Sequence, residues 1–253
     1  WSRTEEPDDP ALTAGLEGAT FDEGRHTAVF DGETFTGRAV YGSLQRRARR
    51  WNLNLDWYER SPTFRADNGF EPQNDLREAW IINGYKIYRD RGLLRLLSLH
   101  LYLRRGWNFA GDVKSNGWQV DAAPYLRWAQ MSGHVQFMRD NERYAGRQYD
   151  GTWYLHSCWD VTPRDGVSAH VGYTFGRQIA RDFERLGDER SGSVSLTLRP
   201  WNRLRLETSY THYGTEDAAT GEELVSGYIA RGKASLQLTP ELAARLVLQY
   251  NDF

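Results

Sequence analysis

Residues 193–210, SVSLTLRPWNRLRLETSY, decide the fold, because their polarity alternates on both sides of a short turn. Apolar side chains dominate the even positions of 193–199, and they do so again in 204–210, after the turn at Pro200–Arg203. Such period-2 alternation predicts β-strands with one apolar face and one polar face. The stretch is therefore predicted to form an antiparallel β-hairpin.

The same alternation recurs elsewhere in the chain, in the segments 51–57, 168–175 and 228–238. The longest segments that read as strands are 77–89, 93–105 and 224–238. They exceed the roughly 5–6 residues that are usual for strands of soluble proteins. They suit a tilted membrane-spanning strand, which needs about 9–11 residues.

The connections between these segments are predicted to alternate between short and long. Tight turns are expected at Asp90–Gly92, Met131–Gly133, Thr162–Gly166, Pro200–Arg203 and Thr239–Pro240. Long loops are expected at 60–76, 106–117, 141–151, 177–190 and 213–222. Outer-membrane barrels have short periplasmic turns and long extracellular loops. The predicted fold class is therefore all-β: an antiparallel up-and-down transmembrane β-barrel, with about 14 strands in this chain, in the outer membrane of a Gram-negative bacterium.

Aromatic residues are abundant, with 10 Trp, 14 Tyr and 10 Phe among 253 residues. Trp and Tyr favour the membrane–water interface, where the apolar ring and the polar group are both satisfied. Pairs of Trp bracket three segments: Trp51 and Trp57, Trp118 and Trp128, and Trp153 and Trp159. Membrane lipids are therefore expected partners, in contact with an aromatic girdle at each edge of the barrel.

The charge balance and the cysteine content exclude several other classes. A net charge of −2, from 32 basic and 34 acidic residues, creates no global field that would attract nucleic acid. The single cysteine, Cys158, rules out an internal disulfide framework and a four-cysteine zinc site. The chain has no stretch of about 18 apolar residues, so we expect no membrane-spanning helix.

The expected topology places both ends of the chain outside the cell. The strand 242–250 follows a short turn and runs outward, and the strand near 11–20 leads into another short turn. Barrels of this kind begin and end in the periplasm, so strands are expected to be missing at both ends of a parent barrel of about 16 or more. Residues 1–253 are thus expected to be one incomplete barrel domain, a fragment with a loop at 1–10 and a long ordered loop at 60–76.

The terminal Phe253 resembles the aromatic end of a barrel-assembly signal, and the barrel-assembly machinery is an expected partner. The phase of the last strand disagrees with that signal. Leu246, Leu248 and Tyr250 occupy even positions, whereas Phe253 is odd.

The polar phase of the strands carries full charges. On a lipid-facing wall a basic residue would cost about 2–4 kcal/mol near the midplane. These side chains must face water or one another, in the lumen of a barrel or on the outer face of a sandwich. The residues expected to line the lumen are Asp56, Asp121, Arg127, His156, His170, Arg205, Glu207, Arg231 and Lys233.

The connection after the strand 51–59 contains SPTFRADNGFEP, residues 61–72. It resembles the motif SPxFRADNGFxP of a family of uncharacterised bacterial outer-membrane proteins, in which a carbohydrate-binding-module-family-9-like domain precedes a large C-terminal barrel. The resemblance extends from about Gly37 to the LQYN ending at 248–251. It departs at Glu71, where the family often has Val, and at Gln73, where Arg is usual. The resemblance implies a C-terminal barrel whose carbohydrate-binding-like domain is missing from this chain.

The motif also has a direct physical interpretation. Pro62 and the turn-forming run Asp67–Gly69 predict an ordered loop. Two roles are open for it: a constriction or ligand contact at the pore mouth, or a plug that is needed only for stability. The candidate loop residues are Ser61, Pro62, Phe64, Arg65, Asp67, Asn68, Gly69 and Phe70.

Motifs for catalysis or for cofactors are absent from the sequence. The six His are scattered without HExxH or zinc-finger spacing, and there is no GxSxG, GxGxxG or P-loop motif. His156 and Cys158 share a strand face, but two residues alone do not make a metal site. We therefore expect no catalytic residue, no cofactor and no metal, and an enzyme is the less favoured interpretation.

The leading hypothesis is an outer-membrane β-barrel of unknown substrate. It would act as a pore for a small solute or saccharide, or as an anchor for the missing carbohydrate-binding-like domain. One alternative is a hydrolase whose catalytic groups lie on the barrel wall. The other is a soluble β-protein that binds carbohydrate through exposed Trp and Tyr.

Overall fold

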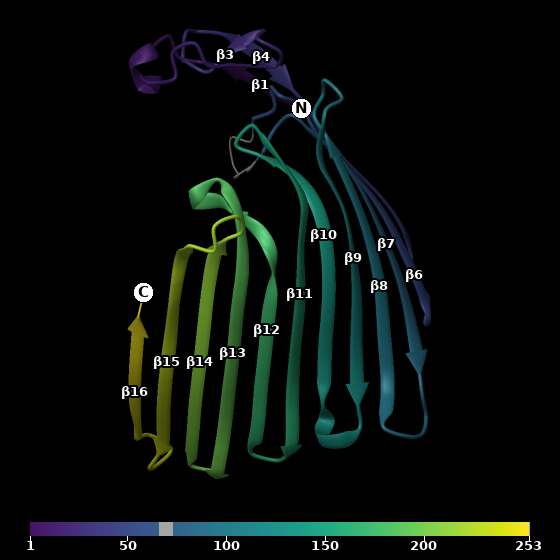
Figure 1. The fold of residues 1–253 in the computed structure, drawn as a ribbon, viewed down its shortest axis with the longest axis vertical. Helices are drawn as coiled ribbons and strands as arrows, with labels where there is room; N and C mark the ends of the chain where they lie inside the picture. The colour runs from purple at the N-terminus through teal and green to yellow at the C-terminus, as the bar shows by residue number, and fades with distance from the viewer. Residues whose placement is uncertain (66–72, 253) are drawn as a thin grey trace. The chain divides into compact units, whose positions relative to one another are not determined.

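The computed structural model describes residues 1–65 and 73–252, and it consists mainly of β-strands (Figure 1). The strands are β1 (Ser2–Glu5), β2 (Thr20–Phe21), β3 (His26–Thr27), β4 (Thr34–Gly37), β5 (Ala39–Arg46), β6 (Trp51–Arg60), β7 (Leu76–Tyr88), β8 (Leu94–Trp107), β9 (Val113–Leu126), β10 (Ser132–Tyr144), β11 (Arg147–Arg164), β12 (Val167–Ala180), β13 (Arg185–Trp201), β14 (Leu204–Asp217), β15 (Glu223–Gln237) and β16 (Ala243–Asp252). Three short 3-10 helices are η1 (Pro10–Thr13), η2 (Trp128–Gln130) and η3 (Arg181–Phe183). Within the described ranges, we find no helix with the length and apolar character needed to span a membrane.

Twelve of the strands form one sheet, in which hydrogen-bonded neighbours follow the order of the sequence from β5 to β16. Each connection is therefore a hairpin, and the chain runs up and down across the sheet. The prediction of an all-β, antiparallel, up-and-down fold is confirmed. Strands such as β11 with 18 residues and β13 with 17 are far longer than the roughly 5–6 residues typical of soluble proteins.

The first strands differ from the prediction. The segments near 11–20 and 26–31 do not join the large sheet, and β5 is its first strand. Instead β1 pairs with β4, and β2 pairs with β3, in two small two-stranded sheets. Residues 1–10, expected as a loop, thus contain β1. Gly15 and Gly18 adopt positive φ, which turns the chain where alternation alone predicts a continuous strand.

The connections also differ from the predicted rhythm. Where a loop was expected at 141–151, β10 and β11 are joined by Ala145 and Gly146 alone, both at positive φ. The other expected loops shrink to 108–112, 181–184 and 218–222, so only 61–75 is markedly longer than the turns at the opposite strand ends. The polar and glycine residues of the shortened loops continue the hydrogen-bonded ladder, which satisfies their backbone groups across each hairpin.

The chain divides into two compact units. One comprises Trp1–Arg47, Leu53–Ile82 and Tyr102–Gly117, and the other comprises Ala48–Asn52, Asn83–Leu101 and Trp118–Phe253. Strands β10 to β16 belong wholly to the second unit, where they lie side by side (Figure 1).

Cross-strand register divides the side chains of β10 to β16 between two faces. Residues that pair directly across a ladder point to the same face. One such row crosses from Trp159 through Val171, Val194 and Tyr210 to Ala230. We call the face that carries this row the apolar face.

The opposite face carries the other residues of the same strands. There a row crosses from Asp160 through His170, Ser195 and Ser209 to Arg231. Every member of this row is polar or charged, and we call this side the polar face.

The described part of the SPTFRADNGFEP motif packs against β4 in the first unit. Ser61 and Thr63 are buried, and their hydroxyls bond to the Arg38 amide at 2.9 Å and the Thr36 carbonyl at 2.7 Å. The guanidinium of Arg65 lies over the rings of Phe21 and Phe35, 5.1 and 5.2 Å from their centroids. Pro62 and Phe64 lie in the same packed segment, and Asp67, Asn68, Gly69 and Phe70 fall outside the described residues.

Gly37 fits this packing because it has no side chain. A Cβ atom there would come within 2.3 Å of the Phe64 Cα, so the loop could not approach as closely. We expect Gly37→Ala to cost about 1–3 kcal/mol through overpacking and to speed hydrogen exchange at the Ser61 amide, which donates to the Arg38 carbonyl. Gly42→Ala is the matched control, because nothing lies within 4 Å of the added methyl group. Equal exchange in the two variants would contradict this packing.

Candidate functional site

The polar face of the second unit is the candidate functional surface, and ion pairs organise one part of it. Glu207 pairs directly with Lys233 across β14 and β15, with 2.6 Å between Nζ and Oε2. The Arg205 guanidinium contacts the other carboxylate oxygen of Glu207 at 2.8 Å. One carboxylate thus partly balances two cations, each on a partly exposed side chain.

Further along the polar face the charges are again mixed in sign. His170 Nδ1 lies 2.9 Å from the Asp160 carboxylate. Arg231 stands between Ser209 on β14 and Gln249 on β16. A selective ion filter would require a ring of charges of one sign. This face instead carries both hydrogen-bond donors and acceptors, with no single sign of charge.

Two further predicted lumen residues, Asp121 on β9 and His156 on β11, are buried or half-buried. The Asp121 side chain is only 8% exposed, and it accepts a hydrogen bond of 2.9 Å from the Gln119 amide. His156 Nδ1 lies 2.8 Å from Thr174 Oγ1 on the next strand. The structure therefore brings six of the predicted lumen residues onto one face by register: His156, His170, Arg205, Glu207, Arg231 and Lys233.

Arg127 and Asp56 are placed differently. Arg127 lies in the connection between β9 and β10, where its guanidinium donates to the carbonyls of Gly92 at 2.8 Å and Leu94 at 2.9 Å. It links two turns and is not part of a strand face. Asp56 belongs to β6 in the first unit, where it accepts a hydrogen bond of 3.3 Å from the Tyr41 hydroxyl.

The apolar face is exposed. The exposed fraction is 51% for Val171, 48% for Val194 and 65% for Leu248. Among the described residues, Phe35 and Tyr149 are the buried hydrophobic side chains, and no side chain is less than 2% exposed. The sheet therefore stands without the hydrophobic core that a soluble sandwich requires.

Aromatic rings form rows across the apolar face. Trp118, Phe137, Trp153 and Phe175, from four successive strands, are linked by centroid distances of 5.4, 6.3 and 5.9 Å. A second row, from β14 to β16, joins three tyrosines at 6.0 and 5.8 Å: Tyr210, Tyr228 and Tyr250. Rows of aromatic rings on one face are typical of the girdles of outer-membrane barrels.

Below these rings lies a band without full charges. On the described strands β11 to β16, the apolar-face positions between the aromatic rows and the short turns carry no charged residue. Along β11 this band runs from Trp153 to Val161, about 26 Å at 3.3 Å per residue. Beyond the aromatic row, toward the loop ends of the strands, charged side chains reappear on this face with the ion pair between Arg177 and Asp188, 2.8 Å apart.

A cavity of about 670 Å³ opens at the loop ends of β11 to β14. Its lining includes Arg147, Tyr149, Arg177, Arg185 and Asp217. The three guanidinium groups each have an acceptor: Arg177 contacts Asp188, Arg185 contacts Asp217 at 3.0 Å, and Arg147 contacts a backbone carbonyl. The cavity thus offers cationic groups that are already partly neutralised.

Asp217 organises the turn beside this cavity. Its carboxylate accepts from the amides of Ala219 at 2.8 Å and Thr220 at 3.0 Å, and from Arg185. These bonds, the backbone amides first and Arg185 after them, lower the pKa of Asp217 from 3.8 to about 2. Hydrogen bonds to the ionised form favour that form, so the turn depends on the charged carboxylate.

One residue of this face was not anticipated from sequence. His134 pairs directly with Cys158, but the two belong to different strands. If 141–151 had been predicted as strand with a tight turn at Ala145 and Gly146, counting residues from that turn would have placed Cys158 close to His134.

Comparisons with known proteins add a structural neighbour. No family model and no curated protein matches the sequence. The crystal structure of Pseudomonas aeruginosa OpdK with vanillate is similar, with 15% sequence identity and a TM-score of 0.48, and the match covers 99% of this chain and 69% of that chain. The vanillate belongs to that structure. For this chain, a functional proposal rests on the two faces of its own sheet.

We expect the Asp217 carboxyl to titrate with a midpoint near pH 2, which carbon-13 NMR of a labelled protein would measure. A depressed pKa stabilises the folded form above the ordinary value near 3.8, and that stabilisation is lost as the pH falls toward 2. Arg185→Gln should raise the midpoint only partly, since the two amides remain. A midpoint at the ordinary value in the unmodified protein would contradict the hydrogen-bonded turn.

Proposed function

We propose that the twelve-stranded sheet forms part of the wall of a bacterial outer-membrane β-barrel. Its apolar face would face lipid, and its polar face would face an aqueous lumen. One observation carries the proposal: the apolar face is exposed and, between the aromatic rows and the short turns, carries no charged residue, over about 26 Å along β11. A lipid-facing band in such barrels is about 25 Å tall and is flanked by aromatic girdles. Because the strands are tilted by about 35–45°, the charge-free stretch of β11 covers roughly 20 Å of that height, and the adjoining aromatic rows add to it.

The alternative of a soluble β-protein agrees poorly with the same surface. Monomeric soluble proteins rarely expose a continuous apolar patch larger than a few hundred Å². Here Val171, Val194 and Leu248, each about half exposed or more, belong to a surface that crosses five or more strands. Lipid is the partner whose chemistry fits a surface of this extent.

The polar face supports transport of a small polar solute, such as a saccharide. Its serines and threonines can form hydrogen bonds with a passing molecule. Because its charged residues are of both signs, the face does not select for a cation or an anion. A second candidate, a closed barrel that anchors another domain, is favoured by the Arg205–Glu207–Lys233 ion pairs, because these charged groups bind one another on the wall and are less available to a solute.

If the apolar face meets lipid, the cost of introducing a charged residue depends on which face of the strand carries it. Val194→Arg, on the apolar face of β13, should cost about 2–4 kcal/mol of folding free energy in lipid bilayers. Ser195→Arg, one residue further on the polar face, is the matched control and should cost much less. Urea titration in phospholipid vesicles, with heat-dependent gel mobility as the test of folding, measures both. Similar costs for the two variants would refute the assignment.

Planar-bilayer recordings separate a pore from a closed anchor. A pore should give discrete conductance steps, and Glu207→Gln should shift its selectivity toward anions, because Arg205 and Lys233 lose their counter-charge. The reversal potential in a salt gradient measures this shift. Glu216→Gln, on the same strand but on the opposite face, should leave it unchanged. Folded protein that conducts no ions would favour the anchor.

A further inference from the structure

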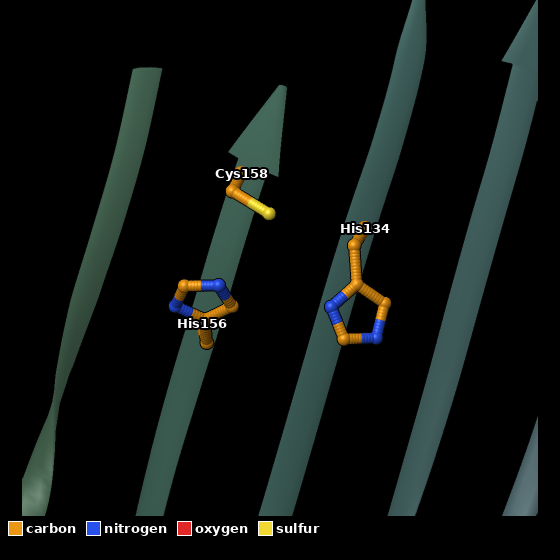
Figure 2. Close-up of side chains that lie close together, drawn as sticks. All are labelled: His134, His156 and Cys158. Atoms are coloured by element: carbon orange, nitrogen blue, oxygen red, sulfur yellow. The ribbon is translucent and has the colours of Figure 1, made fainter. Parts of the chain in front are cut away.

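Three metal-ligating side chains meet on the polar face, where β10 begins and pairs with β11. His134, His156 and Cys158 each place a ligand atom within 4.8 Å of the other two (Figure 2). Figure 2 shows the Cys158 sulfur pointing from its strand toward the neighbouring strand that carries His134. We propose that these three residues bind a zinc-type divalent cation.

Backbone register creates this cluster. Cys158 lies directly opposite His134, and His156 is two residues from Cys158 on the same strand, so all three point to one face. On its other side Cys158 pairs with Gly172, where an added Cβ would meet Ser193 Oγ at 3.1 Å, so a larger residue would crowd this part of the face. The site is therefore held by regular strands, which position ligands more firmly than loops do.

Neighbouring groups fix the orientation of both imidazoles. His156 Nδ1 is held by Thr174 Oγ1 at 2.8 Å, which leaves Nε2 for a metal. His134 Nε2 lies 3.5 Å from the Asp121 carboxylate, which leaves Nδ1. Metal-binding histidines commonly hydrogen-bond through their second nitrogen to a carboxylate or another oxygen. His156 already has such a hydrogen bond, and His134 has the Asp121 carboxylate beside its second nitrogen.

The donor set selects the class of cation. Two imidazoles and one thiolate suit Zn²⁺ and related transition metals, whereas Mg²⁺ and Ca²⁺ require oxygen ligands. Tetrahedral zinc, with bonds of about 2.0–2.3 Å, would draw the ligand atoms to roughly 3.5 Å apart, a change within reach of side-chain rotation. Three protein ligands leave a fourth position for water or a solute.

Charge and proton balance agree with a cation at this place. The side chains of Asp121, 8% exposed, and Asp160 bring negative charge near the cluster. Binding replaces the S–H bond of Cys158 with a sulfur–metal bond, and the proton leaves to water, so the thiol gives one proton per cation bound. This inference needs only the pairing of β9 to β12, and it stands whether or not the lumen conducts.

Cobalt titration tests the proposal, since Co²⁺ reports its ligands by absorption. The full chain, folded in detergent and carried without a polyhistidine tag, should bind one Co²⁺, show a thiolate-to-cobalt charge-transfer band, and release the Co²⁺ to Zn²⁺ but not to Mg²⁺. Cys158→Ser should abolish the band and weaken binding by about 100-fold or more. Thr174→Val should weaken binding by about 10–100-fold, as for other residues that orient a ligand.

His170→Ala supplies the matched control, because His170 lies on the same face but pairs with Asp160 outside the cluster. It should bind cobalt as tightly as the unmodified chain. Heat-dependent gel mobility confirms that each variant is folded. Two results would overturn the site: folded unmodified protein that binds no Co²⁺, or a folded Cys158→Ser variant that keeps the charge-transfer band.

Discussion

The backbone ladder between neighbouring strands is the constraint on which the rest of this structure depends. Each hydrogen-bonded pair fixes which two side chains stand together, and the period of two assigns them to one face or the other. The sheet is a single layer, so each face meets its own surroundings directly. The aromatic rows, the ion pairs of Glu207 and the cluster at Cys158 all follow from pairing.

The two faces differ in how they are stabilised. On the apolar face, side chains as exposed as Val171 and Leu248 gain little from packing within the chain. In the proposed barrel, burial against lipid supplies what a hydrophobic core supplies in a soluble protein. On the polar face, contacts such as His156–Thr174 and Glu207–Lys233 link neighbouring strands through polar atoms. The two faces of the sheet thus differ in chemistry, as the proposed barrel wall requires.

Local patterns predicted much of the fold, including which strands are neighbours, but not the register in which they pair. Alternation in 193–210 is visible in the sequence alone, so β13, β14 and the turn between them were predicted near their true places. The lengths of the long connections were not predicted correctly. Polar residues such as those of 141–151 continue a strand when a neighbouring strand offers backbone hydrogen bonds. His134 escaped notice for the same reason: its neighbour Cys158 is distant in sequence, and pairing is a non-local property.

The ladder of β10 and β11 contains one irregularity, where the register shifts between Asp140 and Glu142. Up to Asp140 the partner numbers add to 292 (140 and 152), and from Glu142 they add to 291 (142 and 149). Along a strand, alternate residues point to opposite faces, so the face of each residue depends on the number of residues that precede it in the strand. A single inserted or deleted residue within the ladder would turn everything beyond it inside out, unless a bulge absorbs it. Such a bulge lets this hairpin change length without exchanging its faces, and it confines tolerated one-residue length variation to irregularities and turns.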